Sequence, residues 1–377
     1  MVRIIKIGMD VHSKKYTLCA LEPKIGEEDC LLASVETTAD YKNILAFIID
    51  LKLKLGYDNE YDIVCGYEAG CLGYSLYNQL TSSHVKCVIL APTTMLTPQG
   101  KRVKTDARDA RMIAQCLGHG GYHSVYIPDE EDASVKEYIR MRDDHKSDLT
   151  KLKQRIDAFC LHNGRYYEKQ NWTLQHMKWL RTVSLPPLVR EALDEYLASF
   201  DNLTAKIERL DNRIEELAGL TKYREKVKRL ICLLGVKTHT ALSLIVETGD
   251  FTRFEKGNTY GAFLGLAPGE NSSGDKVHRT GISKAGNSHL RKLLIEAAHG
   301  ICKGRIGFKS KALRARQQGS PADVIEYADR ANTRMRAKYY RMIRNGKKYN
   351  VAVASVAREL ACFVWGLMTD NIYLAVS

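Results

Sequence analysis

Five short runs rich in β-branched residues lie in the first ninety residues, and their order constrains the fold more than any other feature. We expect strands near residues 3–10, 16–21, 31–35, 62–68 and 85–91. The first three are separated only by turns, which predicts antiparallel pairing. Helical stripes precede each of the last two strands. Three antiparallel strands followed by alternating helices and strands predict a mixed sheet in an α/β domain.

Two of these strands end on an acid, and a later helix carries two more. Asp10 closes the first strand and Glu68 closes the fourth, while Asp106 and Asp109 lie in the stretch Lys104–Arg111. On a helix, residues three apart project from one face, so these two carboxylates repel each other unless a cation lies between them. Such oxygen ligands suit Mg²⁺. The alternative for the octapeptide alone is an ordinary solvated helix of mixed charge.

The four acids, in this order and on these elements, resemble the RNase H-like, RuvC-like nuclease fold. The resemblance implies that Asp10, Glu68, Asp106 and Asp109 form a catalytic DEDD site over the sheet and bind two Mg²⁺ ions. Paired metals of this kind activate an attacking oxygen and stabilise the leaving oxygen in phosphodiester chemistry. We assign residues 1–128 to this domain.

Residues 129–220 are predicted to be helical, and their most regular part is an apolar stripe with alternating spacings of three and four. The stripe consists of Leu193, Tyr196, Phe200, Leu203, Ile207, Leu210, Ile214 and Leu217. This spacing is typical of a coiled-coil seam and favours self-association into a dimer or tetramer. The alternative is a helix packed along a bundle within one chain.

The chain carries a formal net charge of +13, and all of the excess lies in the C-terminal part. From residue 221 onward there are 28 Lys and Arg against 12 Asp and Glu, whereas residues 1–220 carry a net −3. This predicts a polyanionic partner, nucleic acid rather than a membrane. There is no run of 18 apolar residues and no Cys-x-x-Cys pair, so we expect a cytoplasmic protein with reduced cysteines.

A Gly-rich loop within residues 221–377 places two serines among basic residues. Ser272 and Ser273 are surrounded in sequence by Lys276, Arg279, Lys284 and Arg291. A serine hydroxyl is a poor nucleophile unless a base or nearby cations activate it. Taken alone, Ser-Ser-Gly is more often a plain turn.

The whole segment closely resembles the C-terminal domain of a family of bacterial insertion-sequence transposases guided by a bridge RNA. The matching pieces are Ser273-Gly274, Lys276–Arg279, Gly281–Lys284, Gly286-Asn287 and Leu290-Arg291. The sequences around Asp10, Glu68 and Asp106 and the terminal stretch 357–368 also match. The resemblance implies that Ser273 is a catalytic nucleophile, that donor and target DNA are substrates, that a guide RNA is a partner, and that protomers assemble.

Basic residues at several places are predicted to contact nucleic acid, because they can neutralise phosphates. They are Lys101, Arg102, Lys104, Arg108, Lys276, Arg279, Lys284, Arg291, Arg334, Arg336, Lys338 and Arg341. Tyrosines between residues 303 and 348 can stack on unpaired bases, or can pack inward. The apolar stretch 351–369 is predicted to be a buried closing helix.

These observations predict an RNA-guided DNA transposase or recombinase that uses a serine nucleophile and a Mg²⁺-binding carboxylate site. One alternative is a RuvC-like nuclease acting on branched DNA, with Ser273 merely structural. Another is a non-catalytic nucleic-acid-binding protein. A serine recombinase leaves protein covalently attached to DNA, whereas a nuclease leaves protein-free ends.

Overall fold

The computed structural model describes residues 2–56, 60–70, 72–95, 105–270 and 279–372. The chain divides into two compact units, Met1–Ile127 and Pro128–Ser377. Each unit is described by itself below.

The first unit is built on a five-stranded mixed sheet with the order β3-β2-β1-β4-β5. Its strands are β1 (Val2–Val11), β2 (Lys15–Glu22), β3 (Cys30–Thr38), β4 (Glu60–Glu68) and β5 (Lys86–Leu90). The first three pair antiparallel, and β4 and β5 continue the sheet in parallel with β1. The predicted mixed sheet is therefore confirmed.

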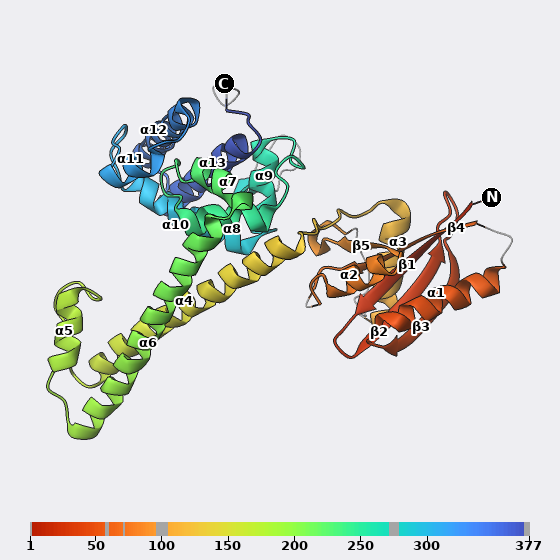
Figure 1. Ribbon diagram of the computed structural model, residues 1–377, viewed down its shortest axis with the longest axis horizontal. Helices are drawn as coiled ribbons and strands as arrows, with labels where there is room; N and C mark the ends of the chain where they lie inside the picture. The colour runs from red at the N-terminus through yellow and green to blue at the C-terminus, as the bar shows by residue number, and fades with distance from the viewer. Residues whose placement is uncertain (1, 57–59, 71, 96–104, 271–278, 373–377) are drawn as a thin grey trace. The chain divides into compact units, whose positions relative to one another are not determined.

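Helices cover both faces of this sheet (Figure 1). Helices α1 (Tyr41–Leu55) and α2 (Ser75–Ser82) pack their apolar sides against one face, with Ile5 and Ile7 of β1 in the same core. A short 3₁₀ turn (Pro92–Thr94) follows β5. Helix α3 (Asp106–His119) packs on the other face, where Ala110 contacts the β2 side chains in a small separate core.

Two glycines let α3 lie unusually close to the sheet. A Cβ added to Gly8 would lie 2.0 Å from the carbonyl oxygen of Ala110 and 2.3 Å from the amide nitrogen of Ala114. A Cβ added to Gly66 would lie 2.8 Å from a methyl group of Leu117. Any larger residue in place of Gly8 would push α3 away from the sheet. The two glycines thus determine where the first turn of α3 lies.

Replacing Gly8 with alanine is expected to lower the free energy of unfolding by about 3 kcal/mol or more, because the added methyl group meets backbone that cannot move aside. Urea denaturation followed by circular dichroism measures the change. Gly70→Ala is the matched control, since its Cβ would meet its nearest atom at 3.8 Å. Equal losses in the two variants would show that the close packing of α3 is not needed.

The second unit contains a long antiparallel helical hairpin, which we call the stalk. It consists of α4 (Glu130–His162) and α6 (Pro187–Ala218), with α5 (Leu174–Thr182) near the turn end (Figure 1). One core near that end joins Ile156 of α4, Leu180 of α5 and Leu193 of α6. At the other end, Ile139 and Ile214 belong to the main core of the unit. The helical prediction for this region is confirmed.

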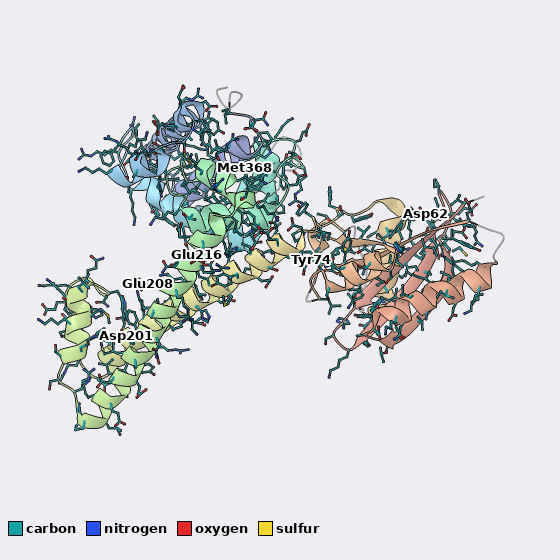
Figure 2. All side chains as sticks on the ribbon, in the orientation of Figure 1. Asp62, Tyr74, Asp201, Glu208, Glu216 and Met368 are labelled. Carbon is teal, nitrogen blue, oxygen red and sulfur yellow. The ribbon has the colours of Figure 1, made fainter. Side chains whose placement is uncertain are left out.

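The apolar stripe on α6 is largely buried inside the single chain. Leu193, Ile207, Leu210 and Ile214 are all at most 6% exposed, and α6 packs along α4. The acids Asp201, Glu208 and Glu216 of the same helix, labelled in Figure 2, are exposed. The intramolecular alternative therefore accounts for the buried positions, and a coiled coil between two copies stays a prediction.

The rest of the second unit is a helical body with one small hairpin. Its elements are α7 (Thr221–Leu230), α8 (Thr238–Thr248), α9 (Gly257–Phe263), β6 (Pro268–Glu270), β7 (Arg279–Ile282), α10 (Ser288–Cys302), α11 (Lys311–Gln317), α12 (Ala322–Arg344) and α13 (Tyr349–Met368). They share one core with Val135 and Ile139 of α4. The proposed division of this unit at residue 220 stays a prediction.

Helix α13 is the centre of that core. By length and composition alone it could cross a membrane, but 61% of its apolar window is buried inside the unit. It packs against α9, α10 and α12. The predicted buried closing helix is thus confirmed.

Candidate functional site

The ends of two neighbouring parallel strands bring Asp10 and Glu68 to one edge of the sheet. The register pairs Gly8 with Gly66 and Met9 with Tyr67, so the two acids occupy the next positions along β1 and β4. Side chains alternate along a strand, which puts both acids on the same face as the two glycines. That is the face covered by α3.

Helix α3 starts beside this edge. The side chain of Thr105 caps the helix by accepting a hydrogen bond from the amide of Arg108. Asp106 and Asp109 lie in the first turn, where negative charge is favoured by the helix dipole. Asp106 comes one turn before Ala110, the residue that contacts Gly8. The close packing of α3 therefore carries Asp106 towards the end of β1.

Asp10, His12 and Asp106 form a compact group whose ligand atoms all lie within 4.8 Å of one another. His12 Nε2 lies 3.4 Å from Asp10 Oδ2. The ammonium group of Lys15 lies 2.7 Å from Asp106 Oδ2, and also pairs with Glu36 at 3.1 Å. The structure thus joins two of the four predicted acids directly.

The charges of neighbouring acids affect Asp10. Burial raises the pKa of Asp10, and the negative charges of Asp106 and Asp109 raise it further, while His12 acts in the opposite direction. A hydrogen bond from Lys15 lowers the pKa of Asp106. Crowded carboxylates favour a cation between them, and their oxygen atoms are the donors that Mg²⁺ prefers. The donor set therefore fits such an ion.

Glu68 and Asp109 are described by the structure but do not belong to that compact group. Glu68 is exposed at the end of β4. Its placement follows from strand register, and that of Asp109 from its position with Asp106 in the first turn of α3.

Sequence reasoning assigned no role to Gly8, Gly66, His12 or Lys15. A signal for the glycines was present, because both strands end in glycine, one residue, then an acid: Gly8-Met9-Asp10 and Gly66-Tyr67-Glu68. For Lys15 no such signal exists, since its pairing with Asp106 depends on tertiary structure.

The two serines fall between the strands of the small hairpin. Ser272, Ser273 and Lys276 lie outside the described residues, as do Lys101, Arg102 and Lys104. Antiparallel pairing of Glu270 with Arg279 brings the two ends of the serine segment together. Of Arg279 only the backbone is described.

Several predicted nucleic-acid contacts are accessible on the second unit. Lys284 is exposed, with a left-handed backbone at φ 57°. Arg341 is also exposed, as is Arg108 in the first unit. Arg291 instead donates a hydrogen bond to the carbonyl of Leu264 at 3.0 Å, which leaves it only partly accessible.

Two further cations share one carboxylate. Arg334 Nε lies 2.6 Å from Glu359 Oε1, and Lys338 Nζ lies 2.7 Å from Glu359 Oε2. Both line an open cavity of about 460 Å³ together with Lys256 and Arg358. A second open cavity of about 470 Å³ in the same unit is lined by Arg305 and Arg344.

The structure corrects the expectation for Arg336, which is not a nucleic-acid contact. Its side chain is 4% exposed, and its guanidinium donates to the carbonyls of Ile301, Arg305 and Phe308 at 3.1, 2.6 and 2.6 Å. Arg336 lies on the inward face of α12, where it ties down the segment after α10. A bound phosphate has no access to it.

Comparison with known proteins bears on both units. A family model described as "Transposase IS116/IS110/IS902 family" matches residues 227–312, which include the hairpin. A second model, a DEDD transposase of IS110 elements, matches residues 7–162, which include all four predicted acids.

The curated relatives include two transposases and a gene-inverting protein. A putative transposase from Sinorhizobium fredii is 35% identical over 306 residues, covering 81% of this chain and 75% of the relative. The transposase for insertion sequence element IS1533 from Leptospira borgpetersenii is 31% identical over 357 residues, covering 92% and 99%. A pilin gene-inverting protein from Moraxella bovis is 24% identical over 230 residues, covering 60% and 62%.

Proposed function

This chain belongs to the IS116/IS110/IS902 family of insertion-sequence transposases, and from that premise we propose that it moves DNA through a serine-linked intermediate under the guidance of an RNA. Members of the family cut and rejoin DNA, so the alternative of a non-catalytic nucleic-acid-binding protein does not hold. The observation that carries the metal-dependent part of the proposal is the convergence of Asp10 and Asp106 from distant elements.

The metal-binding part of the proposal rests on the acids at the sheet edge. Asp10 and Asp106 would hold Mg²⁺, with Glu68 and Asp109 completing the set, in an RNase H-like arrangement. Bound there, the ion supplies positive charge to a transferring phosphate. Lys15 pairs with Asp106 and lowers its pKa, so it helps to keep that carboxylate ionised.

The covalent part rests on the serine segment of the second unit. In the proposed step the Oγ of Ser273 attacks a DNA phosphorus, and the bond from that phosphorus to the leaving strand breaks. The hydroxyl proton is transferred to the leaving oxygen. Lys284 at the base of the hairpin, with Arg279 and Lys276 in the same stretch, would stabilise the charge that develops on the phosphate. The serine ester conserves the phosphodiester, so rejoining needs no ATP.

RNA guidance is supported by the kind of surface that the second unit presents. Its charge is strongly positive, and the accessible cations Lys284 and Arg341 are suited to backbone phosphates. A protein that leaves sequence choice to base pairing needs only such backbone contacts. We further propose that the active form is a dimer or tetramer.

The chain is expected to co-purify from cells that carry its element with one dominant RNA encoded by the element. Changing the presumed pairing segment of that RNA should redirect joining to the matching DNA, as sequencing of the products would show. Unchanged target choice after removal of the RNA would refute guidance. It would not contradict the proposed metal-dependent cutting of DNA.

A further inference from the structure

A buried network of charged side chains joins the stalk to the start of α10. His289 lies between two carboxylates, with Nε2 2.7 Å from Asp143 Oδ2 and Nδ1 3.1 Å from Glu247 Oε1. Asp143 comes from α4 and Glu247 from α8. Arg140 of α4 binds Glu247 in a bidentate manner at 2.7 and 2.9 Å, so α4 contributes to both ends of the network.

The network extends to the helix cap of α10. Asn287 accepts a hydrogen bond from the amide of Leu290 at 3.0 Å, and its own Nδ2 donates to Glu247 at 2.9 Å. Glu247 is only 2% exposed in its side chain. On the α4 side, Asp143 also contacts His239 at 3.0 Å and Arg142 at 2.8 Å.

Charges buried this deeply carry a large desolvation cost, which close pairing offsets. The carboxylates Asp143 and Glu247 raise the pKa of His289 to about 9, against the effect of burial. Burial acts to raise the pKa of Glu247, but the neighbouring cations His289 and Arg140 lower it to about 2. At neutral pH His289 is therefore a cation between the two carboxylates, and it has no lone pair to accept a proton from a nucleophile.

Through Asn287, this network adjoins the backbone segments that flank the β6–β7 hairpin. Backbone hydrogen bonds join Ser283 to Ala267 at 2.9 Å, Lys284 to Gly265 at 3.1 Å and Asn287 to Phe263 at 3.2 Å. A Cβ added to Gly286 would lie 1.9 Å from the carbonyl oxygen of Phe263, so the two strands of backbone are in tight contact. Asn287, which also binds Glu247, is therefore held against the segment that leads into β6.

We propose that His289 is a positioning residue, which clamps the base of the β6–β7 hairpin to stalk helix α4 through Asp143 and Glu247. The inference rests on the proposed function, because the serine that it positions lies between β6 and β7. The clamp acts in the unbound protein as well, so it can be tested without DNA.

The test compares His289→Gln, on α10, with a control variant on stalk helix α4. Asp132→Asn removes another buried carboxylate of α4, one that binds Tyr223 and Lys222 of α7. Asn287→Ser is the milder variant, since serine can still cap α10 but cannot reach Glu247. It keeps the test valid if His289→Gln fails to fold.

Hydrogen exchange by mass spectrometry over residues 279–290 reads the clamp directly. We expect faster exchange in His289→Gln and Asn287→Ser than in the wild type and Asp132→Asn. Single-turnover formation of protein-linked DNA should fall by about 10-fold or more in His289→Gln, because small displacements of reacting groups are costly. DNA affinity should stay unchanged in His289→Gln. A general structural defect would lower DNA affinity as well.

Unchanged exchange in both variants would overturn the clamp. Faster exchange with an unchanged rate of linkage would show that the clamp does not position the nucleophile, which also overturns the proposal. If the wild type never forms protein-linked DNA, the serine mechanism fails. The exchange data then still decide whether His289 holds the hairpin.

Discussion

Replacing Asp10 with asparagine is expected to abolish DNA cleavage without lowering the stability of the protein. Asp10 is nearly isosteric with asparagine, but the substitution removes a carboxylate from the compact group with His12 and Asp106. Cleavage should fall by more than about 100-fold, since even residues that only support metal ligands contribute about 10- to 100-fold. Labelled DNA, guide RNA and Mg²⁺ in a denaturing gel assay measure the loss.

The free energy of unfolding of the metal-free protein should instead increase in Asp10→Asn. Repulsion from Asp106 and Asp109, together with burial, disfavours ionised Asp10, so a neutral asparagine relieves that cost in the metal-free protein. Added Mg²⁺ should raise the melting temperature of the wild type by mass action, and should do so much less in Asp10→Asn.

Asp62→Asn is the matched control for this variant. Asp62, labelled in Figure 2, lies near the start of β4, the strand that Glu68 ends, and pairs with Lys86 at 2.7 Å. It should retain both cleavage and the Mg²⁺-dependent rise in melting temperature. If Asp10→Asn cleaves like Asp62→Asn, Asp10 is not part of the metal site.

The sheet and its acids were predictable because their signals are local. Alternation and β-branched runs mark strands, and the placement of Asp10 and Glu68 follows once two strands lie in parallel. The depth at which α3 packs was not predicted, although it depends on Gly8 and Gly66. A glycine in a strand can have several structural roles, and only the tertiary contact with Ala110 shows that close helix packing is the role here.

The second unit shows why some patterns could not be resolved from sequence. A heptad stripe needs an apolar partner, but its spacing does not say whether that partner is α4 of the same chain or a second copy. Likewise, a cation within a basic helix has no local mark of burial. Arg336 and Arg341 look alike in sequence, yet one is held by three carbonyls and the other faces solvent.

The same limit applies to the network around His289. Its members come from α4, α8 and α10, far apart in the sequence, and each alone looks like an ordinary polar residue on a helix. Only the fold brings a histidine between two buried carboxylates.

Replacing Ser273 with alanine is expected to prevent covalent attachment of the protein to DNA. The hydroxyl oxygen is the atom that would form the phosphoserine bond, so its removal leaves nothing to link. Linkage and strand transfer should fall by about 10³-fold or more, as the loss of a nucleophile commonly does. RNA binding and the hydrogen exchange of residues 279–290 should remain those of the wild type.

Ser272→Ala is the matched control, because it removes a chemically identical hydroxyl one residue away. We expect it to retain part of the activity, and a denaturing gel should still show a protein-linked band. A band in Ser273→Ala but none in Ser272→Ala would mean that the neighbouring serine is the nucleophile. If wild type cuts DNA but never gives a band, a water molecule rather than a serine attacks the phosphate, and the plain RuvC-like nuclease accounts for the cutting. Since Asp10→Asn should stop cutting in either case, the two variants together separate the metal site from the covalent step.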